Sequence, residues 1–376
     1  MNQPRIALLT NFIPPYRVPL YRALATHTSD LLVLLSTPME PNRPWPVAWA
    51  DLHVQMQRSL TFQPMWRHPQ GFQEQLFIHL PYDTLPALAR YQPDVIISGE
   101  LGPRTLQAVL YRRLRPHTRI IAWVTLSEHT EQGRGRARSI LRRVLLRQVD
   151  AVIVNGSSGV RYIARYGVPA ERIFCVPNPV DVSPWLALPL ERTAEQAHRL
   201  LYVGRLVQLK GLTTFLDRLN AWARLHPDRT VQCWLAGDGP LRADLERLPL
   251  APNVQIRFLG NVPYTLLPQV YGQAGILAFP TLSDTWGLVV NEALAAGLPV
   301  LGSRYSQAVE ELISAGETGW TFRTDHAGEL DAALHTALTT TPAELDRMRA
   351  AARAYIRSVT PEAVAAGMME AVRYVT

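Results

Sequence analysis

Short runs of consecutive aliphatic residues recur along the chain, separated by stretches long enough for a helix. In the first half they occupy residues 6–10, 31–37, 95–100, 120–126, 151–156 and 173–178. In the second half they occupy residues 199–206, 230–239, 254–260, 275–281, 298–303 and 319–322. Apolar runs of this length, bounded by Gly, Pro and Asn, are typical of strands buried on both faces of a parallel sheet. The pattern predicts an α/β protein with two doubly wound, Rossmann-like domains.

The boundary between the two domains is expected where this alternation is interrupted. Residues 175–184, "CVPNPVDVSP", contain three prolines and form a stiff connection. We therefore predict one domain over residues 1–180 and a second from residue 181. Two such domains facing one another form a central cleft, the usual place for a ligand. Residues 38–72 have weak periodicity and are predicted to be long surface loops.

Composition places the chain among soluble globular proteins, since 47% of its 376 residues are hydrophobic and 18% are charged. No apolar run approaches the roughly 20 residues that span a bilayer, and the apolar stretch at the N-terminus is too short for a signal peptide. A cytoplasmic location is expected. Cys175 and Cys233 lie in separate apolar runs, which predicts two small core residues and no disulfide.

Positive charge is concentrated in the first half of the chain. Residues 1–182 hold 21 basic and 12 acidic side chains (+9), and the remainder holds 17 and 19 (−2), which gives the net charge of +7. Arginines alternate with Ile140, Leu141, Val144 and Leu145 over residues 134–147. This pattern predicts an amphipathic helix with a basic outer face. That face is either the solvated side of a core-packed helix or a surface that attracts anionic lipid at the inner face of a membrane. No nucleic-acid-binding motif accompanies it.

A candidate phosphate site follows the first strand of the second half. In "YVGRLVQLKGL", Gly204 permits a close turn at the strand end, Arg205 follows at the carboxyl edge of the sheet, and Lys210 precedes the next helix. Ligands of open α/β sheets bind at this edge, and helix N-termini with nearby cations suit phosphate. Lys210 is also the only lysine among 38 basic residues. Two solvated surface charges are the alternative. Gly237 in "LAGDGPL" marks a second, less specific strand-end turn.

Two carboxylates frame the segment "SDTWGLVVNEALAAG". Asp284 precedes the predicted helix, which starts near Trp286 or Gly287, and Glu292 lies about 12 Å further along at ~1.5 Å per residue. They are too far apart to act as acid and base on one bond, but they suit opposite ends of one elongated ligand. The alternatives are an ordinary N-cap for Asp284 and an exposed helix position for Glu292. Small apolar neighbours suggest that the second carboxylate is packed closely and needs partners.

Four motifs, "GRLVQLKGL", "AGDGPL", "FLGNVP" and "SDTWGLVVNEALAAGLPV", resemble in order and spacing those of the family 4 retaining glycosyltransferases, which have the GT-B fold. The resemblance is strong over residues 200–325 and looser before them. It implies that Asp284 binds the donor sugar, in place of the family's glutamate, and that Glu292 binds the ribose. Further implied donor contacts are the cations Arg205 and Lys210, the turns at Gly204 and Gly237, Val262 beside the base, and the backbone amides of Trp286, Gly287 and Leu288.

The resemblance also implies an acceptor-binding domain over 1–180, a nucleotide-sugar domain over 181–358 and a final segment, 359–376, that crosses back to the first domain. Its loop after the first strand, "TNFIPPYR", lacks the family's usual glycine pair. The loop near residue 125 offers His129 or Glu128 as a group that contacts donor sugar or acceptor, and a surface histidine is the alternative. The donor is expected to be a UDP-sugar or a GDP-sugar.

Fixed cations and a helix N-terminus stabilise a departing diphosphate electrostatically, so no metal is required. The sequence has no D-x-D pair and no His or Cys cluster with metal-binding spacing. We predict a metal-independent, retaining transferase that acts on a saccharide or lipid-linked acceptor, in bacterial polysaccharide or glycolipid assembly. The alternatives are a GT-B nucleotide-sugar epimerase and a non-catalytic nucleotide-sugar-binding protein.

Overall fold

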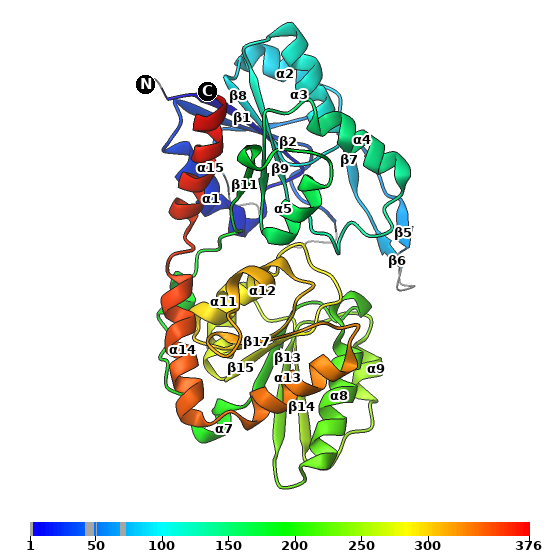
Figure 1. The fold of residues 1–376 in the computed structure, drawn as a ribbon, viewed down its shortest axis with the longest axis vertical. Helices are drawn as coiled ribbons and strands as arrows, with labels where there is room; N and C mark the ends of the chain where they lie inside the picture. Colours follow the sequence, from blue (N-terminus) through cyan, green and yellow to red (C-terminus); the bar gives the residue numbers. More distant parts are fainter. Residues whose placement is uncertain (1–2, 42–48, 50, 68–72) are drawn as a thin grey trace. The chain divides into compact units, whose positions relative to one another are not determined.

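The computed structural model describes residues 3–41, 49, 51–67 and 73–376 (Figure 1). The chain forms two compact units. Unit 1 comprises Met1–Val180 together with Pro361–Thr376, and unit 2 comprises Asp181–Thr360. These limits lie next to the boundaries expected from the prolines after Cys175. The roles of acceptor and donor domain stay predictions.

Unit 1 is built on a seven-stranded sheet in the order β11-β10-β9-β8-β1-β2-β3, and every neighbouring pair in it is parallel. Its strands are β1 (Arg5–Thr10), β2 (Asp30–Leu35), β3 (Val54–Met56), β8 (Val95–Ser98), β9 (Arg119–Val124), β10 (Ala151–Val154) and β11 (Ile173–Cys175). Alternate side chains of β1 enter different cores: Ile6 and Leu8 pack on one face of the sheet, and Ala7 and Leu9 on the other.

Helices cover both faces of this sheet. On the face of Ile6 lie α1 (Val18–Ala25) and the C-terminal α15 (Pro361–Val375), which Figure 1 shows alongside α1. The segment after residue 360 therefore belongs to the core of unit 1. On the other face lie α2 (Thr84–Tyr91), α3 (Pro103–Leu114), α4 (Arg136–Leu146) and α5 (Ser157–Ala164). Short 3-10 turns are η1 (Pro15–Arg17) and η2 (Ala170–Arg172).

Unit 2 has a six-stranded parallel sheet in the order β14-β13-β12-β15-β16-β17. Its strands are β12 (Leu200–Val203), β13 (Val231–Ala236), β14 (Val254–Gly260), β15 (Ile276–Phe279), β16 (Val300–Ser303) and β17 (Gly319–Phe322). Its helices are α6 (Ser183–Leu186), α7 (Ala194–Ala197), α8 (Leu212–Leu225), α9 (Arg242–Glu246), α10 (Leu267–Gly272), α11 (Leu288–Ala295), α12 (Gln307–Leu312), α13 (Ala327–Thr339) and α14 (Pro342–Ile356), with the 3-10 turns η3 (Gln208–Lys210) and η4 (Tyr264–Leu266). The strand order is that of a doubly wound nucleotide-binding sheet, whose order reverses between β12 and β15.

Each of the twelve aliphatic runs coincides with a strand of the two parallel sheets, so the predicted fold class is confirmed.

The prediction of long surface loops over residues 38–72 is wrong in part. Residues 42–48, 50 and 68–72 lie outside the described residues, but the remainder contains β3 and two further strands. These are β4 (Ser59–Phe62), which pairs with β7 (Ile78–Pro81), and β5 (Met65–Arg67), which pairs with β6 (Gln73–Gln75). Such strands escape an apolar-run search because they are three or four residues long and largely exposed.

Two expectations about individual positions are also wrong. Cys233 is buried as predicted, but Cys175 is exposed because it ends β11, the edge strand of its sheet. The predicted basic helix forms as α4, yet Ile140, Leu141 and Val144 face solvent and Arg142 is buried. No helix in the described ranges combines the length and apolar character that crossing a bilayer requires.

Candidate functional site

The candidate donor site lies in unit 2, at the carboxyl ends of β12 and β15, where the strand order reverses. A strand order that reverses leaves a crevice outside the strand ends, because the following chain segments depart in opposite directions. The segment after β12 carries Arg205 and Lys210, and the segment after β15 carries Asp284 and α11. The fold therefore brings together residues more than seventy positions apart.

A glycine fixes the loop that carries Lys210. Gly211 follows η3 with φ of +67°, and a Cβ there would lie 2.2 Å from the carbonyl oxygen of Pro280. The backbone N–H of Leu282 donates to the carbonyl oxygen of Leu209 at 2.9 Å. The loops after β12 and β15 are thus in direct backbone contact, which holds Lys210 beside the segment that precedes α11.

Lys210 and Asp284 form an ion pair, with Nζ 2.5 Å from Oδ2. Both side chains are largely buried, and Nζ also lies 5.6 Å from the centre of the Phe279 ring. Arg205, by contrast, is exposed, and its guanidinium has no hydrogen-bond or ion-pair partner within the described residues. The alternative of two solvated charges therefore fits Arg205 but not Lys210.

The N-terminus of α11 presents open backbone donors beside this pair. Gly287 is the N-cap residue of α11 with φ of +103°, and a Cβ there would lie 2.7 Å from the Phe279 ring. The N–H groups of Gly287 and Leu288 have no acceptor among the described residues. The Trp286 N–H is donated to Oδ1 of Asp284 at 3.2 Å, so a ligand at this amide would have to share or replace that bond, and its predicted contact stays a prediction. Through that bond Asp284 caps a turn and not the helix.

Glu292 projects from α11 toward two tyrosines, the buried Tyr271 and the half-exposed Tyr264. Its side chain is 4% exposed, so the alternative of an exposed helix position is wrong. The Tyr271 hydroxyl donates to Oε2 at 2.7 Å, and Tyr264 also bonds the carboxyl group. Burial raises the pKa of Glu292 to about 7, although both tyrosine hydrogen bonds act to lower it. Trp185 packs edge-on against both tyrosine rings, at 5.4 Å from Tyr264 and 6.1 Å from Tyr271.

The two remaining predicted donor contacts lie on one side of the same sheet edge. Gly237 follows β13, and its N–H donates to the carbonyl oxygen of Gly260 at 2.7 Å. A Cβ at Gly237 would lie 1.9 Å from the carbonyl oxygen of Gly204, so the turns after β12 and β13 pack backbone against backbone. Val262 is half-buried in the loop that begins at Gly260. The structure thus gathers the predicted donor residues of unit 2 at one edge.

Unit 1 holds the other two predicted site residues, in the loop after β9. Glu128 accepts hydrogen bonds from Arg161 (Nε to Oε2, 2.7 Å) and from Arg165. Burial acts to raise the pKa of Glu128, but the hydrogen bond and charge of Arg161, with the charge of Arg165, leave it lowered. The carboxylate is therefore occupied by α5, and its neighbour His129 is half-buried.

Sequence reasoning missed a buried polar group at the corresponding edge of unit 1. Arg104 is buried at the start of α3, 3.0 Å from Glu100, and it also bonds Asn11 and Ser36 at the ends of β1 and β2. The position of Arg104 near a strand end was the available signal. Arg17 lies in the loop after β1, which the sequence did indicate, and is buried over the Trp123 ring, at 4.3 Å from its centre. Tyr264 and Tyr271 offered no signal, because no spacing links them to Glu292.

The described part of the chain contains no group of three or more His, Cys, Asp or Glu side chains arranged to hold a metal ion. The positive charge at the donor edge comes instead from Lys210, Arg205 and the N-terminus of α11.

Comparison with known proteins identifies the family. Residues 20–184 match the family described as Glycosyltransferase Family 4, and residues 197–340 match Glycosyl transferases group 1. The chain belongs to the group 1 glycosyltransferases of family 4, with the GT-B fold.

Solved structures agree on the fold. Anabaena HepE in complex with UDP superposes with a TM-score of 0.72 at 16% sequence identity, and the match covers 99% of this chain and 100% of HepE. The lipopolysaccharide outer core galactosyltransferase WaaB has a TM-score of 0.72 at 15% sequence identity, and the match covers 98% of this chain and 99% of WaaB.

Curated relatives of this group 1 glycosyltransferase have several substrates. The D-inositol 3-phosphate glycosyltransferase of Corynebacterium urealyticum is 26% identical over 54% of this chain and 52% of its own length. The glycogen synthase of Mycobacterium tuberculosis is 30% identical over 55% of this chain and 50% of its own length. The chain thus spans about half the length of the curated relatives it matches. What these relatives share is family membership, not an acceptor.

Proposed function

We propose that this group 1 glycosyltransferase transfers a sugar from a nucleoside diphosphate sugar to a saccharide or lipid-linked acceptor, with retention of configuration and without a metal ion. The observation that carries the proposal is the pairing of Lys210 with Asp284 beside the N-terminus of α11, with Glu292 buried further along the same helix. One helix thereby offers separate contacts for a sugar, a diphosphate and a ribose.

The diphosphate would lie over the N-terminus of α11. Its oxygens would accept from the open N–H groups of Gly287 and Leu288, and Lys210 and the exposed Arg205 would supply opposite charge. The Anabaena protein HepE has been solved with UDP and with UDP-glucose, and it shares this fold. We infer a donor of the same chemical class, a UDP-sugar or a GDP-sugar.

Asp284 and Glu292 would bind the two ends of the donor. A carboxylate beside Lys210 can accept hydrogen bonds from sugar hydroxyls while the lysine reaches the adjacent phosphate. Glu292 would accept from ribose hydroxyls, since its burial and its two tyrosine partners hold it in one orientation. Val262 and the turn at Gly237 would contact the base and phosphates.

The reaction breaks the bond between the anomeric carbon and the donor phosphate oxygen. Negative charge grows on the departing diphosphate, and the preorganised cations and N–H groups stabilise it more than they stabilise the ground state. The acceptor hydroxyl oxygen bonds the anomeric carbon from the same face, and its proton passes to the departing phosphate oxygen. His129 of unit 1 would contact the sugar or acceptor, and bacterial polysaccharide or glycolipid assembly is the proposed setting.

The experiment is a thermal-shift panel of UDP, GDP, ADP and dTDP and their sugars, with EDTA present throughout, followed by assay of donor turnover. Ligands that bind the folded state raise the melting temperature. A shift with one nucleotide family, with sugar transfer to an acceptor in EDTA, supports the proposal. Turnover that required added metal, or release of an epimerised nucleotide sugar without acceptor, would contradict it. So would donor binding with no turnover on saccharide and lipid-linked acceptors.

A further inference from the structure

Helix α4 is turned so that its apolar side faces solvent. Ile140 is 65% exposed and Val144 is 52% exposed, and Leu141 beside them is also exposed. The buried side chains of α4 are instead Arg142, Leu145 and Leu146. At 3.6 residues per turn, Ile140, Leu141 and Val144 lie together on one side of the helix. Burying this stripe in the core, as the sequence pattern suggested, would require the helix to rotate.

A buried ion pair fixes this rotation. Arg142 is almost fully buried and pairs with Glu131, which is buried too, while its guanidinium also bonds the Tyr162 hydroxyl of α5. A buried arginine without these partners would be costly. Because Arg142 must point toward Glu131, the stripe on the opposite side of α4 must point away from the core.

The neighbouring helix α3 exposes a second apolar stripe. Leu106, Leu110 and Leu114 follow one another at spacings of four residues, and all three are exposed, Leu114 by 71%. Helices α3 and α4 pack against each other within unit 1 (Figure 1). We call these six side chains the α3–α4 face: Leu106, Leu110, Leu114, Ile140, Leu141 and Val144.

The charged side chains that α3 and α4 themselves carry are all positive, and one of them, Arg138, pairs with the buried Glu131 at 3.4 Å. Exposed arginines stand beside the apolar side chains on both helices, namely Arg113, Arg136, Arg138 and Arg143. Neither α3 nor α4 contains an aspartate or a glutamate. Long arginine side chains at the margin of an apolar helix face can extend their charged ends to an interface while their methylene groups remain in apolar surroundings.

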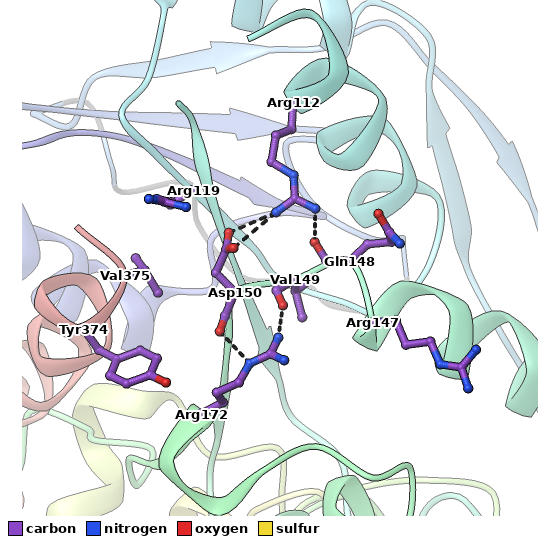
Figure 2. A pocket seen from close by; sticks show the side chains of 9 residues that line it. All are labelled: Arg112, Arg119, Arg147, Gln148, Val149, Asp150, Arg172, Tyr374 and Val375. Carbon is purple, nitrogen blue, oxygen red and sulfur yellow. Dashed lines mark hydrogen bonds and ion pairs between the residues drawn. The ribbon is translucent and has the colours of Figure 1, made fainter. Parts of the chain in front are cut away.

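An arginine hollow adjoins the ends of both helices. The hollow has a volume of about 470 Å³. Figure 2 shows Arg112, from the last turn of α3, and Arg172 on either side of Asp150, with Arg119 and Arg147 at opposite sides of the hollow. Arg112 pairs with Asp150 at 3.1 Å, and Arg172 donates to the backbone carbonyl oxygen of Asp150 at 2.8 Å. Arg119 and Arg147 have no hydrogen-bond or ion-pair partner within the described part of the chain. The hollow thus adds unneutralised positive charge at the end of the α3–α4 face.

We propose that the α3–α4 face docks on the surface of a bilayer that contains anionic phospholipid, with the apolar stripes among the acyl chains and the arginines at the phosphates. A second copy of the chain is a poor occupant, because pairing two such faces would bring arginines against arginines. Nucleic acid would use the arginines but leave the six apolar side chains in water. An anionic bilayer satisfies both features at once. Lipid phosphates at the edge of the docked face would meet Arg147 and, at the opposite side of the hollow, Arg119.

The test is co-sedimentation of the full chain with vesicles of phosphatidylcholine, with or without phosphatidylglycerol. We expect binding to the anionic vesicles only, and weaker binding at high salt because the exposed arginines are then screened. Ile140→Gln with Val144→Gln, and separately Arg143→Gln with Arg147→Gln, should each weaken binding about tenfold or more. All four positions are exposed, so these variants should fold like the wild type.

Matched controls lie in unit 2. Leu225 is 79% exposed at the end of α8, and its neighbour Arg224 is exposed and has no partner within the described ranges. Leu225→Gln and Arg224→Gln should bind vesicles like the wild type. Equal binding to both kinds of vesicle, or face variants that behave like these controls, would overturn the proposal. So would a dimer in sedimentation velocity that Ile140→Gln with Val144→Gln dissociates. The proposal does not depend on the donor site, so nucleotide binding should be unchanged in every face variant.

Discussion

The Nζ atom of Lys210 lies 2.5 Å from Oδ2 of Asp284, so the only lysine of the chain neutralises the carboxylate that precedes α11. This pairing changes the interpretation of both residues. Lys210 is positioned by Asp284 before any diphosphate arrives, and Asp284 is in turn oriented by Lys210. A pre-formed arrangement of opposite charges reduces the reorganisation needed when charge develops on a departing phosphate.

Asp284→Asn should separate the two tasks proposed for this pair. The variant loses the negative charge beside the sugar but leaves Lys210 free for phosphate, so turnover should fall by about a hundredfold or more while affinity for the nucleoside diphosphate is kept. Steady-state kinetics and calorimetric titration measure the two effects. Full turnover in a folded variant would show that Asp284 has no part in the proposed site.

Glu292 should make stability depend on pH. Its pKa in the folded protein is about 7, against 4.5 for an ordinary glutamate, so between these values the folded state keeps a proton that the unfolded state has released. The contribution is fully present below about pH 4.5 and is lost as pH rises through 7, about 3 kcal/mol in all. Glu292→Gln should abolish this dependence. Urea unfolding from pH 5 to pH 8 tests it, and identical pH profiles for the two proteins would count against it.

Tyr271→Phe should shift that pH profile upward. The Tyr271 hydroxyl donates to Glu292 and acts to lower its pKa, so its removal should raise the pKa further. Loss of a buried hydrogen bond to an acid should also cost about 1–2 kcal/mol of unfolding free energy. Tyr82→Phe is the control, because Tyr82 is exposed and its hydroxyl has no partner within the described residues. An unshifted profile in Tyr271→Phe would show that the Tyr271 hydroxyl does not act on the pKa of Glu292.

Gly211→Ala should destabilise unit 2 by more than about 1 kcal/mol, because the position has positive φ and a Cβ would strike the Pro280 carbonyl oxygen. Gly328→Ala is the matched control. Gly328 lies in α13 with nothing within 4 Å of a Cβ, so this change should be neutral or slightly stabilising. Denaturant titration of the two variants makes the comparison, and equal stability would show that the loop relaxes around the new methyl group.

The fold was predictable where strands are buried on both faces. Runs such as those of β10 and β15 are continuous aliphatic segments, and burial on both faces leaves no other pattern open to them. The strands β3, β4 and β5 were not predictable, since they are three or four residues long and largely exposed. The rotation of α4 that exposes its apolar side was equally unpredictable from the sequence. It depends on the ion pair between Arg142 and Glu131, which helical periodicity does not indicate.

The donor site was predictable to a similar extent. Strand ends and glycines located Lys210, Asp284 and the start of α11, because the topology of a parallel sheet brings such positions to one edge. Side-chain partners were not predictable. The Lys210–Asp284 pair, the two tyrosines on Glu292 and the arginines that hold Glu128 depend on packing between segments that the sequence does not place.

The central claim is that Lys210 and the N-terminus of α11 bind a nucleoside diphosphate, and a calorimetric titration of Lys210→Gln tests it most directly. The ligand is the nucleoside diphosphate that binds the wild type best, and Arg224→Gln is the control. We expect Lys210→Gln to lose about 1–3 kcal/mol of binding free energy, or roughly 5- to 150-fold in Kd, with the control close to the wild type. A folded Lys210→Gln protein that binds the nucleotide as tightly as the wild type would contradict the account.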